Sequence, residues 1–260
     1  MYARRVRARA SGFSGGLRIG ADFFERRGWV AAGAPRVVVD RIEDLAHPGI
    51  DVTRIDPRVV AFFDDTAGLE LHIRSRWVFP FSLLWRAFFF LVRWMGQFVY
   101  PRDEGRIVTR AFAVDREKDG RPDARGILRT YVDSNDVMQA VSYATWERDG
   151  RRFMSAAFPL LFGRMMGLLR MDPLGDHGGV VLTSARRDGD DAGVWFVLGP
   201  LAIPTPLGER LELWPPGELG APVEAPPPGI PAPTILGRHE QRIFGIRFVT
   251  HHYWFWPSAS

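Results

Sequence analysis

The sequence predicts an α+β domain in which an antiparallel β meander, forming a curved sheet or an incomplete barrel, packs against a long amphipathic and largely apolar helix. Three features of the sequence point to this fold class. Residues 79–101 are the most apolar part of the chain. From residue 105 onward, short β-like segments follow one another between Gly and Asp turns. Residues 241–256 are expected to form a long aromatic strand at the end of the series.

The composition fits one domain and excludes several chemistries. The 260 residues are 46% hydrophobic, which is enough for a sizeable core. The chain has no cysteine, so disulfides, thiolate metal sites and cysteine nucleophiles are excluded. We expect residues 21–260 to form a single domain, preceded by a flexible basic arm over residues 1–20.

The positive charge is concentrated at the start of the chain. The formal net charge is +4, and the segment MYARRVRARA holds the arginines that account for all of it, Arg4, Arg5, Arg7 and Arg9. A basic arm on a neutral body is not the charge pattern of a nucleic-acid groove, so we expect no nucleic-acid partner. Such an arm is suited to the anionic headgroups of a membrane surface.

Two elements are expected before the apolar helix. Asp56 is a good N-cap and Pro57 a good first residue for a helix that ends at Gly68. In the next stretch, LELHIRSRW at residues 69–77, apolar and polar residues alternate. This period of two predicts a strand with one buried and one solvated face.

Residues 79–101, FPFSLLWRAFFFLVRWMGQFVYP, predict a helix with a narrow polar stripe. At about 100° per residue, the polar residues fall within roughly 60° of one another; they are Ser82, Arg86, Arg93 and Gln97. For membrane insertion, about a dozen apolar residues gain about 5 kcal/mol and two arginines cost about 6 kcal/mol, so the balance is near zero. A helix of this kind needs apolar cover on most sides. The sequence favours a mostly buried domain helix and leaves a membrane-surface helix and a membrane span as alternatives.

The second half of the chain predicts a meander of strands. Asp149-Gly150 is a strong hairpin turn. Residues 158–171 fit either a strand pair or a short helix. Residues 215–234 are Pro-rich and are expected to be a long mobile connection between two strands of one sheet. The strands are expected near residues 106–114, 126–132, 138–147, 151–158, 180–185, 194–198, 210–214 and 241–256.

The last of these strands, RIFGIRFVTHHYWFWP, is apolar on both faces. Phe248, His252 and Trp254 share one face, and the other face is also largely apolar. A strand of this kind lies in the middle of a sheet covered on both sides, or lines a barrel whose other face is buried. Together with Trp195, it predicts an aromatic-lined concavity. We expect no metal site there, because His251 and His252 are neighbours on a strand and face opposite sides.

The N-terminal glycines suggest an alternative function. Residues 11–41 resemble the opening of a short-chain dehydrogenase, since a helix follows a cluster of glycines and Asp40 lies about 20 residues beyond Gly20, where the ribose-binding acid belongs. The resemblance implies an oxidoreductase or a degenerate dinucleotide-binding protein. The chain departs from that family because no strand precedes the glycines and no Tyr-x-x-x-Lys follows. The GFSGG segment at residues 12–16 matches a nucleophile elbow only in its letters, because no strand precedes Ser14.

The C-terminal third carries a second, weak resemblance. Residues 198–214, LGPLAIPTPLGERLELW, followed by residues 243–257, IFGIRFVTHHYWFWP, resemble uncharacterised bacterial β-rich domains of unknown function. This resemblance implies no activity.

These observations predict a binding protein rather than an enzyme. The expected function is binding of a hydrophobic small molecule or lipid in a cavity between the curved sheet and the apolar helix, at a membrane surface. Such pockets have mostly apolar walls and a few polar groups that orient the ligand. We expect no catalytic residue, cofactor or metal, and a cytoplasmic location with peripheral contact at the inner membrane face. The expected ligand-binding residues are Trp85, Arg86, Phe89, Arg93, Trp195, Phe248, His252 and Trp254, with Arg86, Arg93 and His252 orienting the ligand.

Overall fold

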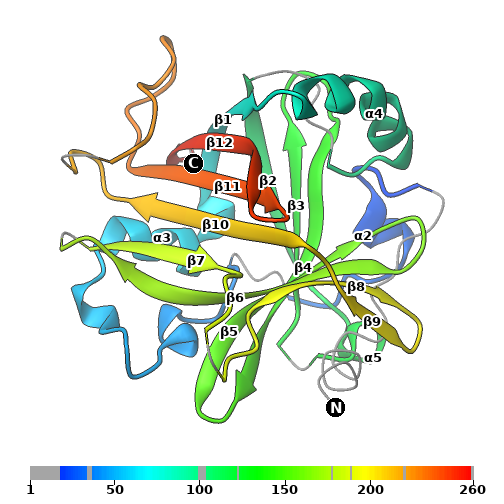
Figure 1. Ribbon diagram of the computed structural model, residues 1–260, viewed down its shortest axis with the longest axis horizontal. Helices are drawn as coiled ribbons and strands as arrows, with labels where there is room; N and C mark the ends of the chain where they lie inside the picture. Colours follow the sequence, from blue (N-terminus) through cyan, green and yellow to red (C-terminus); the bar gives the residue numbers. More distant parts are fainter. Residues whose placement is uncertain are drawn as a thin grey trace.

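The structure is a closed antiparallel β-barrel with a two-strand extension (Figure 1). The computed structural model describes residues 18–33, 37–98, 104–121, 123–176, 178–187, 189–218 and 221–258. The strands found there are β1 (Leu69–Trp77), β2 (Glu104–Ala113), β3 (Arg125–Tyr131), β4 (Val137–Arg148), β5 (Arg151–Pro159), β6 (Arg164–Leu174), β7 (Gly179–Thr183), β8 (Gly193–Leu198), β9 (Leu201–Pro204), β10 (Leu207–Trp214), β11 (Ile235–Ile243) and β12 (Ile246–Pro257).

Ten of these strands form the barrel wall. Their order is β5-β4-β3-β2-β1-β12-β11-β10-β7-β6, and β5 pairs with β6 to close the ring. Strand β8 pairs with the first half of β6, and β9 pairs with β8, so these two strands leave the ring as a short extension. Every neighbouring pair among them is antiparallel.

The fold expected from the sequence, a curved sheet packed against a long helix, is wrong. Because the sheet closes on itself, its concave face is filled mainly by its own side chains and by a short segment before β1, and the long helix does not cover it. The helices within the described residues are α2 (Phe23–Arg26), α3 (Pro57–Asp64), α4 (Phe81–Met95) and α5 (Arg116–Asp119), with 3₁₀ turns at 42–45, 52–54 and 66–68.

The predicted series of strands is confirmed except at its C-terminal end. Residues 158–171 turn out to be the end of β5 and most of β6, so they form a strand pair. The aromatic stretch predicted as one strand is a hairpin, because Phe244 and Gly245 both have positive φ angles, of 50° and 79°. Strands β9 and β11 were not anticipated as separate elements. Strand β1 alternates between buried and partly exposed positions as predicted.

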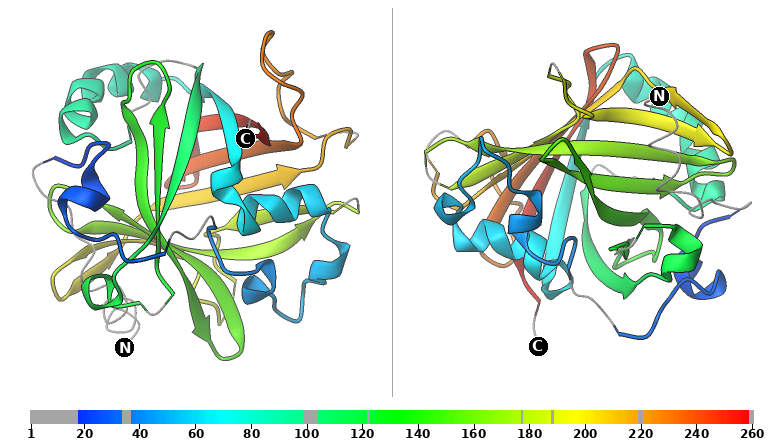
Figure 2. Two further views of the ribbon diagram at one scale, coloured as in Figure 1. Left: turned by 180° about the vertical axis from the view of Figure 1, so that it is seen from behind. Right: turned by 90° about the horizontal axis from the view of Figure 1, so that it is seen from below.

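The barrel interior is closed by a segment that precedes β1. Val59, Phe62 and Phe63 of α3 belong to the same buried cluster as the inward-facing residues of the strands. Asp56 caps this helix as predicted, its side chain accepting from the backbone N–H of Arg58. The segment is tied to the barrel by the backbone bond from Asp56 N to the Gly178 oxygen, 3.0 Å. Figure 2 shows it, blue to cyan, packed against the strands.

The Pro-rich segment joins β10 to β11, which are neighbours in one sheet, as the sequence predicts. It crosses the outer face of β1 and β12, where the backbone N–H of Glu224 donates to His252 Nδ1 over 3.2 Å. Trp254 Nε1 in turn donates to the Glu224 oxygen over 3.2 Å. The Glu224 carboxylate accepts from Arg76 Nε over 2.8 Å and from Arg74 Nη1 over 3.2 Å. These bonds with Arg76 and Arg74 hold the pKa of Glu224 down at about 2.

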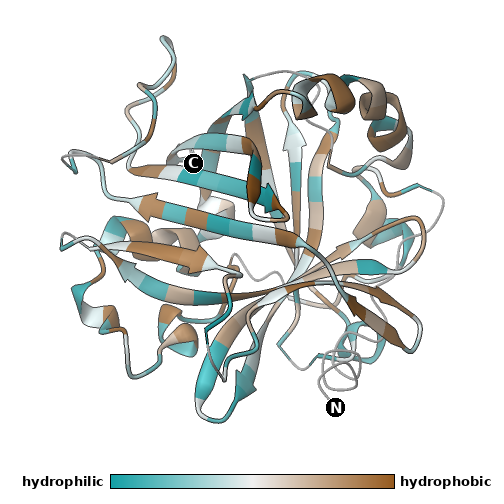
Figure 3. Ribbon diagram, in the orientation of Figure 1, coloured by the Kyte–Doolittle hydropathy of each residue, from teal (hydrophilic) through white to brown (hydrophobic). Residues whose placement is uncertain are grey.

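Helix α4 lies on the outside of the barrel (Figures 1 and 3). Most of its side chains are partly or fully exposed. The expectation of a helix buried over most of its girth is therefore wrong. Gly96, with φ 69°, takes the left-handed conformation that ends the helix after Met95. The helix is anchored through Trp85, which stacks on Trp77 of β1 with ring centroids 4.4 Å apart. Phe81 also contacts Phe248 of β12, with a centroid distance of 5.8 Å.

Candidate functional site

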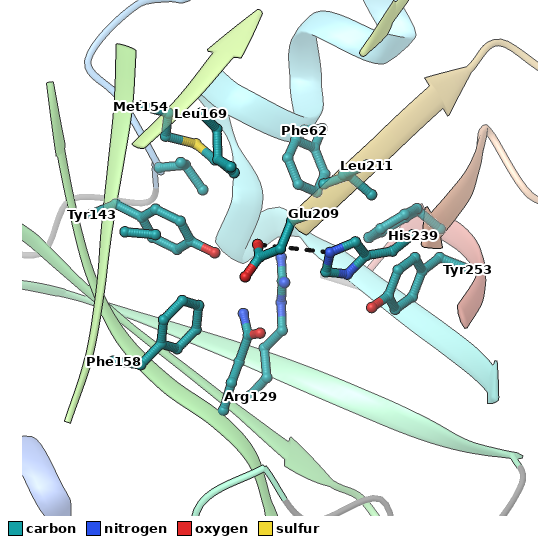
Figure 4. Close-up of a pocket in the computed structure, with 14 residues that line it drawn as sticks. Phe62, Arg129, Tyr143, Met154, Phe158, Leu169, Glu209, Leu211, His239 and Tyr253 are labelled. Carbon is teal, nitrogen blue, oxygen red and sulfur yellow. Dashed lines mark ion pairs between the residues drawn. The ribbon is translucent and has the colours of Figure 1, made fainter. Parts of the chain in front are cut away.

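A small cavity lies inside the barrel, beneath the segment that closes it (Figure 4). Its volume is about 50 Å³, which is room for roughly three to five water-sized groups. The walls are mostly apolar, but several polar side chains point into the space. The lining residues are Val38, Phe62, Arg129, Gln139, Tyr143, Met154, Ala156, Phe158, Leu169, Glu209, Leu211, His239, Tyr253 and Phe255.

The strand pairing places the polar side chains opposite one another. Arg129 of β3 is directly paired with Gln139 of β4, and the register shifts by one residue immediately beyond this pair. Met138 is the extra residue on β4, so it is a β-bulge beside the cavity. On the other wall, Leu211 pairs with His239 of β11, and Glu209 lies two residues before Leu211 on the same face of β10. The apolar side chains of β5 and β6 line the remaining side.

Glu209 and His239 form a close pair in which both groups favour their neutral forms. Glu209 Oε2 lies 3.8 Å from His239 Nε2, and both side chains are mostly buried. Burial raises the pKa of Glu209 to about 7. Burial, with the nearby charge of Arg129, lowers the pKa of His239 to about 4. Near pH 6 the pair is therefore a carboxylic acid beside a neutral imidazole, and not an ion pair.

Arg129 brings a positive charge into the cavity, and no ion pair joins it to another of the described residues. The residue is only 7% exposed, and its guanidinium carbon lies 5.9 Å from the centre of the Phe62 ring. Within the part of the chain that the structure describes, its Nε has no hydrogen-bond partner, and the same is true of Gln139 Nε2 across the strand pair. A buried donor without an acceptor costs about 1–3 kcal/mol. The cavity therefore presents two donors and one cation to whatever enters it.

Two further polar residues, His251 and Ser75, lie next to His239 in the barrel wall. His239 pairs with His251 of β12, and the two ring centroids are 5.9 Å apart. Ser75 of β1 lies 2.8 Å from His251 Nδ1 through its Oγ. Burial lowers the pKa of His251 well below its usual value. Ser75 and His251 are both buried, so this pair braces the wall beside the cavity and is not open to a substrate.

The residues predicted from the sequence lie at three places outside this cavity. Trp85, Arg86, Phe89 and Arg93 are on α4, where Arg86 and Arg93 point to solvent. Trp195 belongs to a separate buried cluster around β8 and stacks under Arg186. The structure thus does not bring the two groups together.

The other three predicted residues lie on the outer face of β12. Phe248 contacts α4, whereas His252 and Trp254 are covered by the Pro-rich segment through Glu224. The residues of β12 that line the cavity, Tyr253 and Phe255, are on the opposite face. A ligand-binding role for the eight predicted residues stays a prediction.

The residues of the cavity carried one usable signal in the sequence. In GILRTY, residues 126–131, Arg129 occupies the same face as Ile127 and Tyr131, and that face is inward. A charged residue at an inward position of a buried strand indicates a functional group. Glu209 in LGERLELW could not be recognised in the same way. Arg210 and Glu212 are charged residues on the other face of the same strand, and the sequence does not show which face is inside.

The N-terminal motifs fall largely outside the described residues. The basic arm up to Gly16, with the GFSGG segment, lies outside the described residues. Of the dinucleotide-binding features, Gly20 lies in a turn and Asp40 forms an ion pair with Arg125. The β pairing of the described residues before α3 is limited to one isolated antiparallel bridge, Val30 to Val114. These residues therefore form no parallel βαβ unit.

Comparison with known proteins gives one informative match. No protein-family model matches the chain, and no solved structure matches it. Over 225 residues, the chain is 25% identical to the "Uncharacterized membrane protein YndJ" of Bacillus subtilis (strain 168). The match covers 83% of this chain but only 37% of the length of that protein. This agrees with the expected resemblance to bacterial proteins of unknown function. Among the described residues, no helix is both long enough and apolar enough to cross a membrane.

Proposed function

We propose that the barrel binds a small amphipathic anion, with an acidic group at Arg129 and an apolar body in the rest of the cavity. Arg129 is the observation that carries this proposal, because a buried guanidinium that no described carboxylate pairs with attracts a carboxylate or a similar anion. The Nε of Arg129 and the Nε2 of Gln139 are the donors such a group would use. Both belong to facing positions of β3 and β4, so a single acid group can reach both.

The two ends of the cavity differ in polarity as this ligand class requires. Figure 4 shows Met154, Leu169 and Phe158 gathered on one side, away from Glu209 and His239. Apolar walls with a few convergent polar groups are typical of small-molecule sites. The neutral form of Glu209 below pH 7 also matters, because a neutral carboxyl does not repel an incoming anion.

The volume sets the size of the ligand. A cavity of about 50 Å³ accepts a short acid directly. A longer chain, such as a fatty acid, requires the segment that carries Val38 and Phe62 to move outward, since those two side chains form part of the lining. Affinity is therefore expected to rise with chain length over the first few carbons and then to depend on movement of that segment.

The test is calorimetric titration of the purified chain with straight-chain carboxylates from acetate to decanoate at pH 6. We expect saturable binding that Arg129→Met abolishes. Arg106→Met is the matched control, because Arg106 is exposed on β2 and pairs with Glu70 on the outer surface. Equal binding by both variants, or no binding of any acid by the native chain, would show that the cavity does not bind such anions.

A further inference from the structure

The outward face of α4 is apolar, which is the reverse of a normal surface helix. The side chains of α4 that pack toward the barrel include Trp85, Val92 and Met95. On the opposite face, Phe90 is 77% exposed, Trp94 57% and Leu83 56%. The helix is thus apolar both toward the barrel and toward solvent. We call its exposed apolar residues the α4 face; they are Leu83, Leu84, Ala87, Phe88, Phe90, Leu91 and Trp94.

The charged residues of α4 lie on one flank of this face. At about 100° per residue, Arg86 and Arg93 are about 20° apart, whereas Leu83, Phe90 and Trp94 occupy the centre of the exposed arc. The helix contains no acidic residue. Arg93 lies 3.7 Å from Asp136 and is more than half exposed. The flank therefore carries positive charge directly beside a wide apolar surface.

The exposed apolar surface continues beyond the N-terminal end of α4. Phe79, which precedes the helix, is 74% exposed. On β12, Ile246 is exposed and lies two residues before Phe248 on the same face, and Phe248 contacts Phe81. An exposed apolar surface of this extent marks an interaction site in a soluble domain.

We propose that the α4 face docks this protein flat onto an anionic bilayer surface. A helix with a wide apolar face flanked by arginines lies in the membrane interface, with its apolar side chains among the acyl chains and its cations at the headgroups. The 15 residues of α4 are about 22 Å long, so the helix is suited to lie in the interface plane. Trp85 and Val92 hold it against the barrel, which sets that orientation.

Lipid fits this surface better than a second protein chain. The positive flank complements anionic headgroups, and the arginines at positions 4, 5, 7 and 9 add charge that the same headgroups would attract. The Bacillus subtilis relative is named a membrane protein, and the chain matches 37% of its length, which agrees with contact between this sequence and a bilayer. This inference does not depend on the cavity inside the barrel, since no residue of the α4 face lines it.

The test is flotation of the whole chain with vesicles of phosphatidylcholine containing 30% phosphatidylglycerol, and with vesicles of phosphatidylcholine alone. We expect preferential binding to the anionic vesicles. Leu83→Glu with Phe90→Glu should lower the partition coefficient about tenfold or more, because two large apolar side chains are lost from the contact. Leu201→Glu is the control, since Leu201 is an exposed apolar residue on β9, away from α4 in Figure 1.

A second readout uses the absence of cysteine from the chain. Phe90→Cys and Leu201→Cys can each be labelled with an environment-sensitive fluorophore without a background signal. Anionic vesicles should shift the emission to the blue at position 90 and leave position 201 unchanged. Absence of vesicle binding, or binding unaffected by the double glutamate variant, would overturn the proposal. So would dimerisation in size-exclusion chromatography that the same variant abolishes, because a second copy would then cover the face.

Discussion

Replacing Glu209 with glutamine should remove a defined part of the pH dependence of stability. Burial raises the pKa of Glu209 from its usual 4.5 to about 7, so the folded state favours the protonated acid. The stability that this group contributes is complete below pH 4.5 and is lost as the pH rises through 7. The difference in pKa corresponds to about 3 kcal/mol in total, of which roughly 1 kcal/mol is lost between pH 6.5 and 8.5.

His239 acts in the opposite direction over a lower range. Its pKa falls from 6.5 to about 4, so its contribution is complete above pH 6.5 and is lost as the pH falls toward 4. Between pH 4.5 and 6.5 the two groups largely cancel. Above pH 6.5 the histidines of the unfolded chain still lose part of their charge, so the effect of the carboxyl is isolated by comparing the native chain with Glu209→Gln, which contains the same histidines.

The assay is urea unfolding at half-unit steps from pH 4.5 to 8.5. The unfolding free energy of the native chain, taken relative to that of Glu209→Gln, should fall by about 1 kcal/mol from pH 6.5 to 8.5, because the histidines common to both chains cancel in the difference. His239→Asn is the companion variant, which should keep the loss at high pH. Parallel profiles of the native chain and Glu209→Gln above pH 6.5 would refute the assignment of a buried acid.

Three further changes test the structure. Arg129→Met should raise the unfolding free energy by about 1–3 kcal/mol without ligand, since it removes a buried cation and an unsatisfied donor; a large destabilisation, measured in urea, would contradict this. Asp119→Asn should cost about 3–5 kcal/mol by the same measurement, because Asp119 and Arg121 are buried with 2.6 Å between Oδ1 and Nε. Glu224→Gln should remove about 1–2 kcal/mol at pH 7, after allowance for partial exposure, and the native advantage should vanish as the pH falls from 4.5 toward 2. Faster amide exchange in residues 221–234 should accompany that last change.

The sequence predicted local elements well where one residue pattern determines them. The cap at Asp56, the alternation in β1 and most of the meander depend on neighbouring residues, and they are found as expected. Closure of the sheet depends on β5 pairing with β6 and on β1 pairing with β12, which are contacts that no local pattern encodes.

The candidate site was harder to predict because β12 is apolar on both faces. The even-numbered residues, such as Trp254, were taken to line the cavity, but they are covered from outside by the Pro-rich segment. The odd-numbered residues Tyr253 and Phe255 face the cavity. The sequence showed that both faces are buried and did not show which one meets the core. The wrong prediction of a buried α4 has the same cause. The sequence pattern of this helix showed that its surface is apolar, but it did not show what lies against that surface.

Closure of the barrel also determines how the molecule can open. Each of the ten wall strands is hydrogen-bonded to a neighbour on both sides. None of them can therefore separate without breaking its hydrogen bonds to two strands. Among the described strands, β9 alone pairs with a single neighbour, and it is only four residues long and ends at Pro204. A short edge that ends in proline is a poor template for another chain. Slow, cooperative amide exchange is therefore expected around the ring, with early exchange confined to the β8–β9 extension.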